Sequence, residues 1–141
     1  MHHDPSNLIS AVSKACGRKL DRNDFNDRLI MQKGCYILNT WGFGPNYRYR
    51  LYIRGPYSSE LADDYYESDD IGYVTTIPGE AIDELSLILK KGIRYTEAYA
   101  TVLLVKNNNP SKDEVTVLNK ALSIKPNLKK EVTEACTSIF A

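Results

Sequence analysis

The chain contains Leu51-Tyr52-Ile53-Arg54-Gly55-Pro56-Tyr57-Ser58-Ser59-Glu60-Leu61, where a strand pattern gives way to a helix start. Gly55 tolerates backbone conformations that other residues avoid, and Pro56 fixes its own φ and lacks an N–H donor, so this pair predicts a turn. Ser58 or Ser59 can accept hydrogen bonds from the first N–H groups of a helix. We therefore expect a strand, a turn and a helix in immediate succession.

The residues before the turn alternate between two kinds of side chain. Because successive side chains of a strand point to opposite faces, one face carries Tyr47, Tyr49, Leu51 and Ile53. The other face carries Arg48, Arg50, Tyr52 and Arg54. We expect the first face to pack on the core and the second to present cations and an aromatic ring.

Apolar residues recur at helical spacing on both sides of this stretch. Upstream they predict a short helix from Asp4-Pro5 to Gly17 and a longer one from Phe25 to Trp41. Gly34 lies inside the longer helix, where a glycine most often marks close packing against a neighbour. Downstream they predict helices that begin at Ser59, at Pro78, before Tyr95, at a Ser111-x-x-Glu114 capping box and at Pro126.

The segment from Ile71 to Ile77 is rich in strand-forming residues. We expect residues 72 to 77 to pair with residues 47 to 53 in a two-stranded antiparallel ribbon. The predicted fold is mainly α, a helical bundle with this small ribbon, and the order of helix, strand, helix and strand gives a winged-helix-like N-terminal half. At 141 residues we expect one domain, with the N-terminal helices and ribbon in 1–77 and a helical bundle in 78–141.

The composition limits the classes of function. The formal net charge is zero, which gives no global field for nucleic acid or anionic membrane. The three cysteines form no Cys-x-x-Cys pair, and no apolar run is long enough to cross a membrane. We expect a cytoplasmic protein without a metal, a cofactor or a membrane contact.

Catalytic chemistry has few candidate residues here. The two histidines, His2 and His3, lie at the extreme N-terminus, where side chains are poorly fixed, and we assign them no function. No glycine-rich phosphate loop is present. An enzyme would need a carboxylate cluster such as Asp63, Asp64 and Glu67, but acids at a helix start are commonly solvated. We expect no enzymatic activity.

Basic and acidic residues fall in adjacent segments around the turn. The basic ones include Arg48, Arg50 and Arg54, and the segment from Gly55 to Asp70 carries only acids. One interpretation is mutual pairing, in which an arginine binds Asp63, Asp64 or Glu67 across the turn. The other is a recognition surface, since Tyr and Arg dominate interface hot spots.

A second group of residues is expected to support the turn. Gln32, Lys33 and Tyr36 lie about one helical turn apart and should pack beneath the turn, because Gln can satisfy backbone groups that make no ladder bonds. The full structural motif comprises Gln32, Lys33, Tyr36, Gly55, Pro56, Ser58 and Leu61.

Three segments carry a family resemblance: Arg28-Leu29-Ile30-Met31-Gln32-Lys33-Gly34-Cys35-Tyr36-Ile37-Leu38, Tyr47-Arg48-Tyr49-Arg50-Leu51-Tyr52 and Gly55-Pro56-Tyr57-Ser58-Ser59-Glu60-Leu61-Ala62-Asp63-Asp64. Their pattern resembles the YwgA-like family of small uncharacterised prokaryotic proteins. It is more distantly similar to the Panacea domain of SocA-type antitoxins and phage-associated proteins. The resemblance implies a non-enzymatic domain that works by binding protein, an antitoxin-like role among the possibilities.

The expected partner is a protein, bound by the polar strand face of Arg48, Arg50, Tyr52 and Arg54 together with Tyr57. The alternative is a winged-helix nucleic-acid binder, which the acids after the turn disfavour because they would repel a phosphate backbone.

Overall fold

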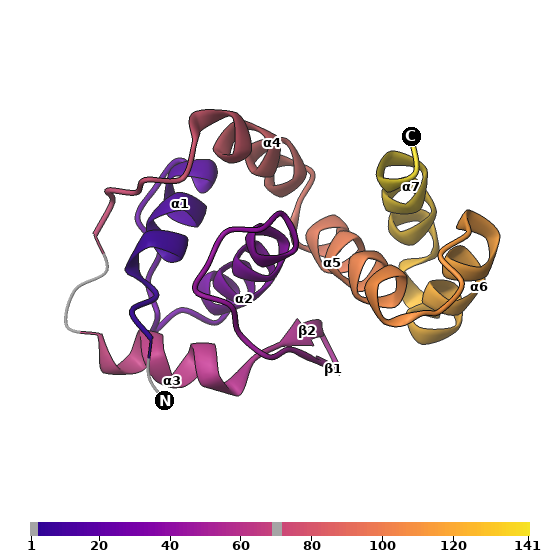
Figure 1. Ribbon diagram of the computed structural model, residues 1–141, viewed down its shortest axis with the longest axis horizontal. Coiled ribbons are helices and arrows are strands. Elements are labelled where there is room, and N and C mark those ends of the chain that lie inside the picture. The colour runs from indigo at the N-terminus through magenta and orange to yellow at the C-terminus, as the bar shows by residue number, and fades with distance from the viewer. Residues whose placement is uncertain (1–2, 69–71) are drawn as a thin grey trace.

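The computed structural model describes residues 3–68 and 72–141, and it is mainly helical (Figure 1). Within these residues the elements are, in chain order, α1 (Ser6–Cys16), α2 (Phe25–Thr40), β1 (Arg50–Tyr52), β2 (Gly55–Tyr57), α3 (Ser59–Glu67), α4 (Gly79–Lys90), α5 (Ile93–Asn108), α6 (Glu114–Ile124), the 3-10 turn η1 (Pro126–Leu128) and α7 (Lys129–Ile139). The predicted fold class, mainly α with a small antiparallel ribbon, is confirmed.

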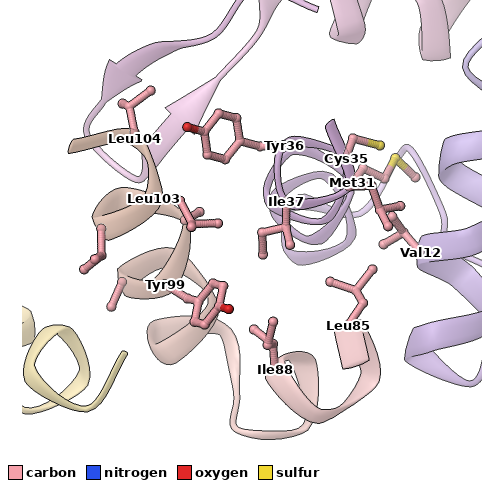
Figure 2. Packing of buried hydrophobic residues seen from close by; sticks show 14 of the residues in the cluster. Val12, Met31, Cys35, Tyr36, Ile37, Leu85, Ile88, Tyr99, Leu103 and Leu104 are labelled. Carbon is pink, nitrogen blue, oxygen red and sulfur yellow. The ribbon is translucent and has the colours of Figure 1, made fainter. Parts of the chain in front are cut away.

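Helix α5 lies at the centre of the molecule, between α2 and α4 on one side and α6 and α7 on the other (Figure 1). Every residue from Tyr95 to Val105 in it is buried. In the close view of the core, Ile37 of α2 points toward Leu103 of α5 (Figure 2). The same hydrophobic cluster includes residues of every α-helix from α1 to α7. The core is therefore continuous along the described chain.

Helices α1 and α2 approach each other closely at Gly34. A Cβ atom built on Gly34 would lie 2.7 Å from Cγ1 of Val12, closer than a normal carbon contact. The close-packing role predicted for Gly34 is thus confirmed.

The ribbon is a tight hairpin that differs from the predicted one. β1 pairs with β2, with Arg50 opposite Tyr57, Leu51 opposite Pro56 and Tyr52 opposite Gly55. The chain reverses at Ile53 and Arg54. Gly55 and Pro56 follow this reversal and therefore belong to the second strand. Both strands therefore precede α3, and the predicted winged-helix-like order is wrong.

The partner strand predicted at residues 72 to 77 is also wrong. These residues have no regular secondary structure, and Ile71 lies outside the described residues. Asn7 of α1 holds the segment, since its carbonyl oxygen accepts from the Thr75 hydroxyl at 2.9 Å and its Oδ1 accepts from the Thr76 N–H at 2.8 Å. Side-chain bonds to a helix thus replace strand pairing.

The predicted buried strand face is only partly correct. Tyr47 is buried and Tyr49 half-buried, but Leu51 is 39% exposed and Ile53 is 89% exposed. The reason is the early reversal of the chain, which carries Ile53 to the tip of the hairpin and away from the core.

Two helix starts also differ from the prediction. α1 begins at Ser6, with Pro5 rather than Asp4 at the N-cap. α6 is capped by Asp113, whose carboxylate accepts from the Thr116 N–H at 3.1 Å. Ser111, predicted as the cap, donates its hydroxyl to Asp113 at 2.5 Å.

Candidate functional site

The hairpin is fastened to α2 by two adjacent polar side chains. Gln32 donates through Nε2 to the Ser58 carbonyl at 2.9 Å and accepts from the Ser58 N–H at 2.8 Å. Lys33 donates through Nζ to the Pro56 carbonyl at 2.6 Å. The predicted contact of Gln32 and Lys33 with the turn is confirmed.

The other members of the predicted motif shape the entry into α3. The Ser58 hydroxyl accepts from the N–H of Leu61, which caps α3, and Leu61 is fully buried. Tyr36, one turn further along α2, makes an edge-on ring contact with Tyr49, with centroids 4.8 Å apart. The motif therefore fixes both the hairpin and the helix that follows it.

Beneath the hairpin lies a charge cluster of the buried Lys33, Glu97 and Lys125, which the exposed Arg54 joins from the hairpin. The Lys125 ammonium lies 3.2 Å from Oε2 of Glu97 and also donates to the Ile53 carbonyl. The Arg54 guanidinium lies 3.9 Å from Oε1 of Glu97. Lys33, Glu97 and Lys125 are each 5% exposed or less. Three cations thus surround one carboxylate at a site largely shielded from water.

Lys33 is the cation of this cluster without a carboxylate of its own. Within the described residues no ion pair forms at its Nζ, whose hydrogen bond goes to the neutral Pro56 carbonyl. Burial lowers the pKa of Lys33 to about 8, the positive charges of Lys125 and Arg54 act in the same direction, and Glu97 opposes them. The protonated form of Lys33 is therefore less stable in this site than it would be in water.

Gly55 allows the hairpin to lie directly on α5. Its φ is +91°, a conformation that favours glycine. A Cβ atom there would lie 3.1 Å from the Thr101 hydroxyl oxygen and 3.2 Å from Cγ of Glu97. Both the backbone conformation and the space require glycine at this position.

A groove of about 270 Å³ opens between the start of α2 and the hairpin, and we call it the α2–hairpin groove. Its wall contains exposed aromatic surface, since Phe25 is 52% and Tyr52 is 51% exposed. The Tyr52 and Tyr57 rings meet edge to face, with centroids 5.2 Å apart. The lining residues are Phe25, Leu29, Lys33, Tyr52, Ile53, Arg54, Gly55 and Tyr57. Two are cations and none is acidic.

A second groove, of about 230 Å³, separates β1 from α5 and α6. Its charged members are Arg50 and Lys120, and it too lacks an acidic residue. The remaining lining residues are Tyr49, Leu51, Leu104, Val105, Asn108, Asn109 and Ile124. The hairpin is thus flanked by two grooves that both favour negative charge.

The structure brings most of the predicted binding residues together on the hairpin. Register places Arg50 opposite Tyr57, and Tyr52 contacts Tyr57. Arg48 is exposed just before β1, where its main-chain N–H donates to Glu60 at 3.4 Å. Arg54 pairs with Glu97 of α5, a partner outside the acidic segment considered from the sequence.

The acidic helix α3 has a structural role at Asp64. This residue is 4% exposed and accepts from the Tyr47 hydroxyl at 2.7 Å and from the His3 N–H at 3.0 Å. His3 is therefore held in place, contrary to the expectation for the N-terminus, and its ring meets Tyr47 edge-on. Among the residues described, no group of three or more His, Cys, Asp or Glu is placed to hold a metal ion.

Three residues of the site were not identified from the sequence. Phe25 was assigned only as a helix start, and the signal for its role is an aromatic ring one turn before Leu29 on the same helix face. Glu97 lies in the buried stripe of α5, where an unexplained charge is itself a signal. Lys125 follows α6 immediately before a proline, and no sequence pattern marks it as buried.

Comparisons with protein-family models, with curated proteins and with solved structures found no match. In the part of the chain that is described, no helix combines the length and the apolar character needed to cross a membrane. We therefore infer function from the geometry of the hairpin and its two grooves.

Proposed function

We propose that this chain is a non-enzymatic protein-interaction module whose partner surface is the hairpin. The observation that carries the proposal is the exposure of a large apolar tip, with Ile53 89% and Tyr52 51% exposed, between cationic side chains. The proposed surface comprises Arg48, Arg50, Tyr52, Arg54 and Tyr57, and we add Ile53 and Phe25 because their side chains are exposed beside these residues.

The composition of this surface supports a protein partner. Tyr and Arg are enriched among the residues that dominate interface energetics. Exposed apolar side chains that adjoin one another cost free energy in water, which a partner recovers by covering them.

The attachment of the hairpin supports the same proposal. Lys33 of α2 binds the carbonyl oxygen of Pro56, and Lys125, between α6 and η1, binds that of Ile53. A recognition loop already held in one conformation loses less entropy on binding than a free loop. The hairpin is thus suited to present its tip.

The cellular location and the class of partner are also part of the proposal. A cytoplasmic location accords with three free cysteines, of which Cys35 and Cys136 are buried. An antitoxin-like role, in which the partner is a toxin protein, rests on the distant similarity to the Panacea domain.

Site-specific photocrosslinking tests the proposed surface. A photoreactive amino acid replaces Ile53 at the hairpin tip, and in a control protein it replaces Leu87, which is 65% exposed on α4. Expression in the native host followed by mass spectrometry should identify one protein crosslinked from position 53 and not from position 87. That protein is then purified, and its affinity should fall about tenfold or more in the Tyr52→Ala variant.

Two results would overturn the proposal. One is equal crosslinking from the two positions. The other is salt-sensitive binding to duplex or single-stranded DNA that weakens in Arg48→Ala and Arg50→Ala, which would favour the nucleic-acid alternative.

A further inference from the structure

We propose that the α2–hairpin groove binds an acidic segment of the partner protein in which a carboxylate adjoins an aromatic or large aliphatic side chain. This inference rests on the proposed function and specifies the chemistry of the partner.

Positive charge exceeds negative charge among the residues at the base of the α2–hairpin groove. Lys33 lines the groove, is 2% exposed and makes its hydrogen bond with a neutral carbonyl. Glu97 already lies next to Lys125 and Arg54, so the cluster holds three cations for one carboxylate. Buried charges are stable when paired. The Arg54 guanidinium is 53% exposed, so a carboxylate at the groove can bind it and bring a second negative charge to this cluster.

The second argument is the apolar wall. Phe25, Leu29, Ile53 and Tyr57 line the groove beside the two cations. The Arg54 guanidinium lies 5.8 Å from the centroid of the Phe25 ring, so cation and aromatic surface are directly adjacent. A peptide that contacts both the cations and the apolar wall needs a negatively charged side chain within one or two residues of an apolar side chain.

The size of the groove favours a side chain over a complete small ligand. Its volume is about 270 Å³, whereas pockets for drug-sized molecules span roughly 300–1,000 Å³. The groove is also open, with more than half of the Phe25 surface exposed, as a docking site for a peptide segment requires.

The surroundings disfavour an extended phosphate backbone. The helix α3 begins two residues after Tyr57 and carries Glu60 and Asp63, and the Glu60 carboxylate accepts from the Arg48 N–H at 3.4 Å. A row of phosphates would meet repulsion from these acids, while a single carboxylate bound at Arg54 lies on the cationic side of the groove.

Peptide titration of the isotope-labelled full chain tests the inference by NMR. The probe is the capped peptide Gly-Asp-Phe-Asp-Gly, and its controls replace both Asp by Asn or replace Phe by Ser. We expect the probe to shift the amides of Phe25, Ile53 and Arg54 at millimolar concentration. Both control peptides should bind about tenfold more weakly, and added salt should weaken the probe.

Protein variants then locate the binding. Arg54→Gln changes a side chain that is 53% exposed, so it should fold normally and weaken the probe about tenfold. Lys130→Gln, at an exposed position of α7 outside both grooves, removes the same charge and is the control, which should bind the probe like the unmodified protein.

Three results would overturn the inference: no amide shift at millimolar probe, equal binding of the Asn peptide, or equal weakening by Lys130→Gln and Arg54→Gln. Each is distinguishable from failure of the proposed function. If a protein still crosslinks from position 53, the interaction surface stands and only the acidic-segment chemistry is wrong.

Discussion

At the scale of single residues, two neighbours on α2 bind the main chain of a distant segment. Gln32 bonds both the N–H and the carbonyl of Ser58, and Lys33 bonds the Pro56 carbonyl. Ser58 is buried and has little access to water, so its N–H depends on Gln32, while its carbonyl also accepts from the Ala62 N–H within α3. The attachment therefore concentrates much of the hairpin's stability in two residues.

Replacement of Gln32 by Leu should lower the free energy of unfolding by about 1–3 kcal/mol. The change leaves the buried Ser58 N–H without a partner, which costs about 1–3 kcal/mol, whereas the Ser58 carbonyl still accepts from the Ala62 N–H at 3.1 Å. Urea denaturation measures the difference. Asn26→Leu, at an exposed position of the same helix, is the control and should change stability by about 0.5 kcal/mol or less. Equal effects of the two changes would contradict this role.

Lys33 predicts a pH dependence of stability. Its pKa is about 8 in the folded protein and 10.5 in an ordinary setting, so between these values the folded amine is neutral and the unfolded amine charged. Unfolding then takes up a proton, and the stability that Lys33 contributes rises with pH across the window, by at most about 1.4 kcal/mol per unit.

The measurement compares the unmodified protein with Lys33→Met from neutral to alkaline pH. The buried Cys35 and several tyrosines also have raised pKa values and act in the opposite direction at alkaline pH, but they are common to both proteins. The stability of the unmodified protein relative to Lys33→Met should therefore increase above pH 8. A constant difference would show that Lys33 titrates normally.

At the scale of elements, the spacing between α1 and α2 depends on Gly34. Gly34→Ala should destabilise the fold by about 1–3 kcal/mol, because the new methyl group meets Val12 at 2.7 Å. Without this contact the change would stabilise the helix by up to about 1 kcal/mol, so the sign is decisive. In a Val12→Ala background the cost should shrink, and a double-mutant cycle measures that coupling.

The start of α6 offers a second test at this scale. The pKa of Asp113 is about 2 because the Ser111 hydroxyl and the Thr116 hydroxyl and N–H stabilise its carboxylate. Its ordinary value is 3.8, so the stability it contributes is present above pH 3.8 and is lost as the pH falls toward 2. Asp113→Ala should therefore destabilise more than Ser111→Ala at neutral pH. If thermal melts show that Ser111→Ala is the more destabilising of the two variants, Ser111 and not Asp113 would be the cap of α6.

The elements show what sequence patterns can and cannot predict. α2 and α3 were placed correctly, since apolar spacing and a cap at Asp24 or Ser58 are local signals. β2 was missed because Gly55 and Pro56 are typical of a turn, whereas in the fold they pair with β1 in a hairpin that Lys33 and α5 hold in place.

The candidate site was likewise predicted from the sequence only in part. The Tyr and Arg alternation marked the hairpin as a surface, and the contact of Gln32 with the turn followed from hydrogen-bond requirements. Glu97 and Lys125 lie many residues from the hairpin, and their meeting with Arg54 is a property of tertiary packing. No local pattern could have predicted it.

At the scale of the whole molecule, α5 joins the two halves of the core, and we predict that the chain unfolds in one step. Trp41, at the end of α2, reports on the N-terminal half by fluorescence, and circular dichroism reports on all helices. The two unfolding curves should coincide.

A core change in the C-terminal half extends this test. Val132→Ala, at a fully buried position of α7, should lower stability by about 2 kcal/mol and shift both curves equally. If the fluorescence curve stays in place while circular dichroism shifts, residues 1–77 and 78–141 would be separate folding units.

The lysine anchors have a consequence for how the hairpin can evolve. Both bind carbonyl oxygens of the main chain, at Ile53 and Pro56, and such an oxygen is present whatever side chain the position carries. Substitutions at residues 51 to 54 therefore leave the anchors intact, while Gly55 remains fixed by its contacts with α5. Homologues can diverge in partner choice by exchanging tip residues on a constant scaffold, and a library randomised at these four positions would explore the same freedom in the laboratory.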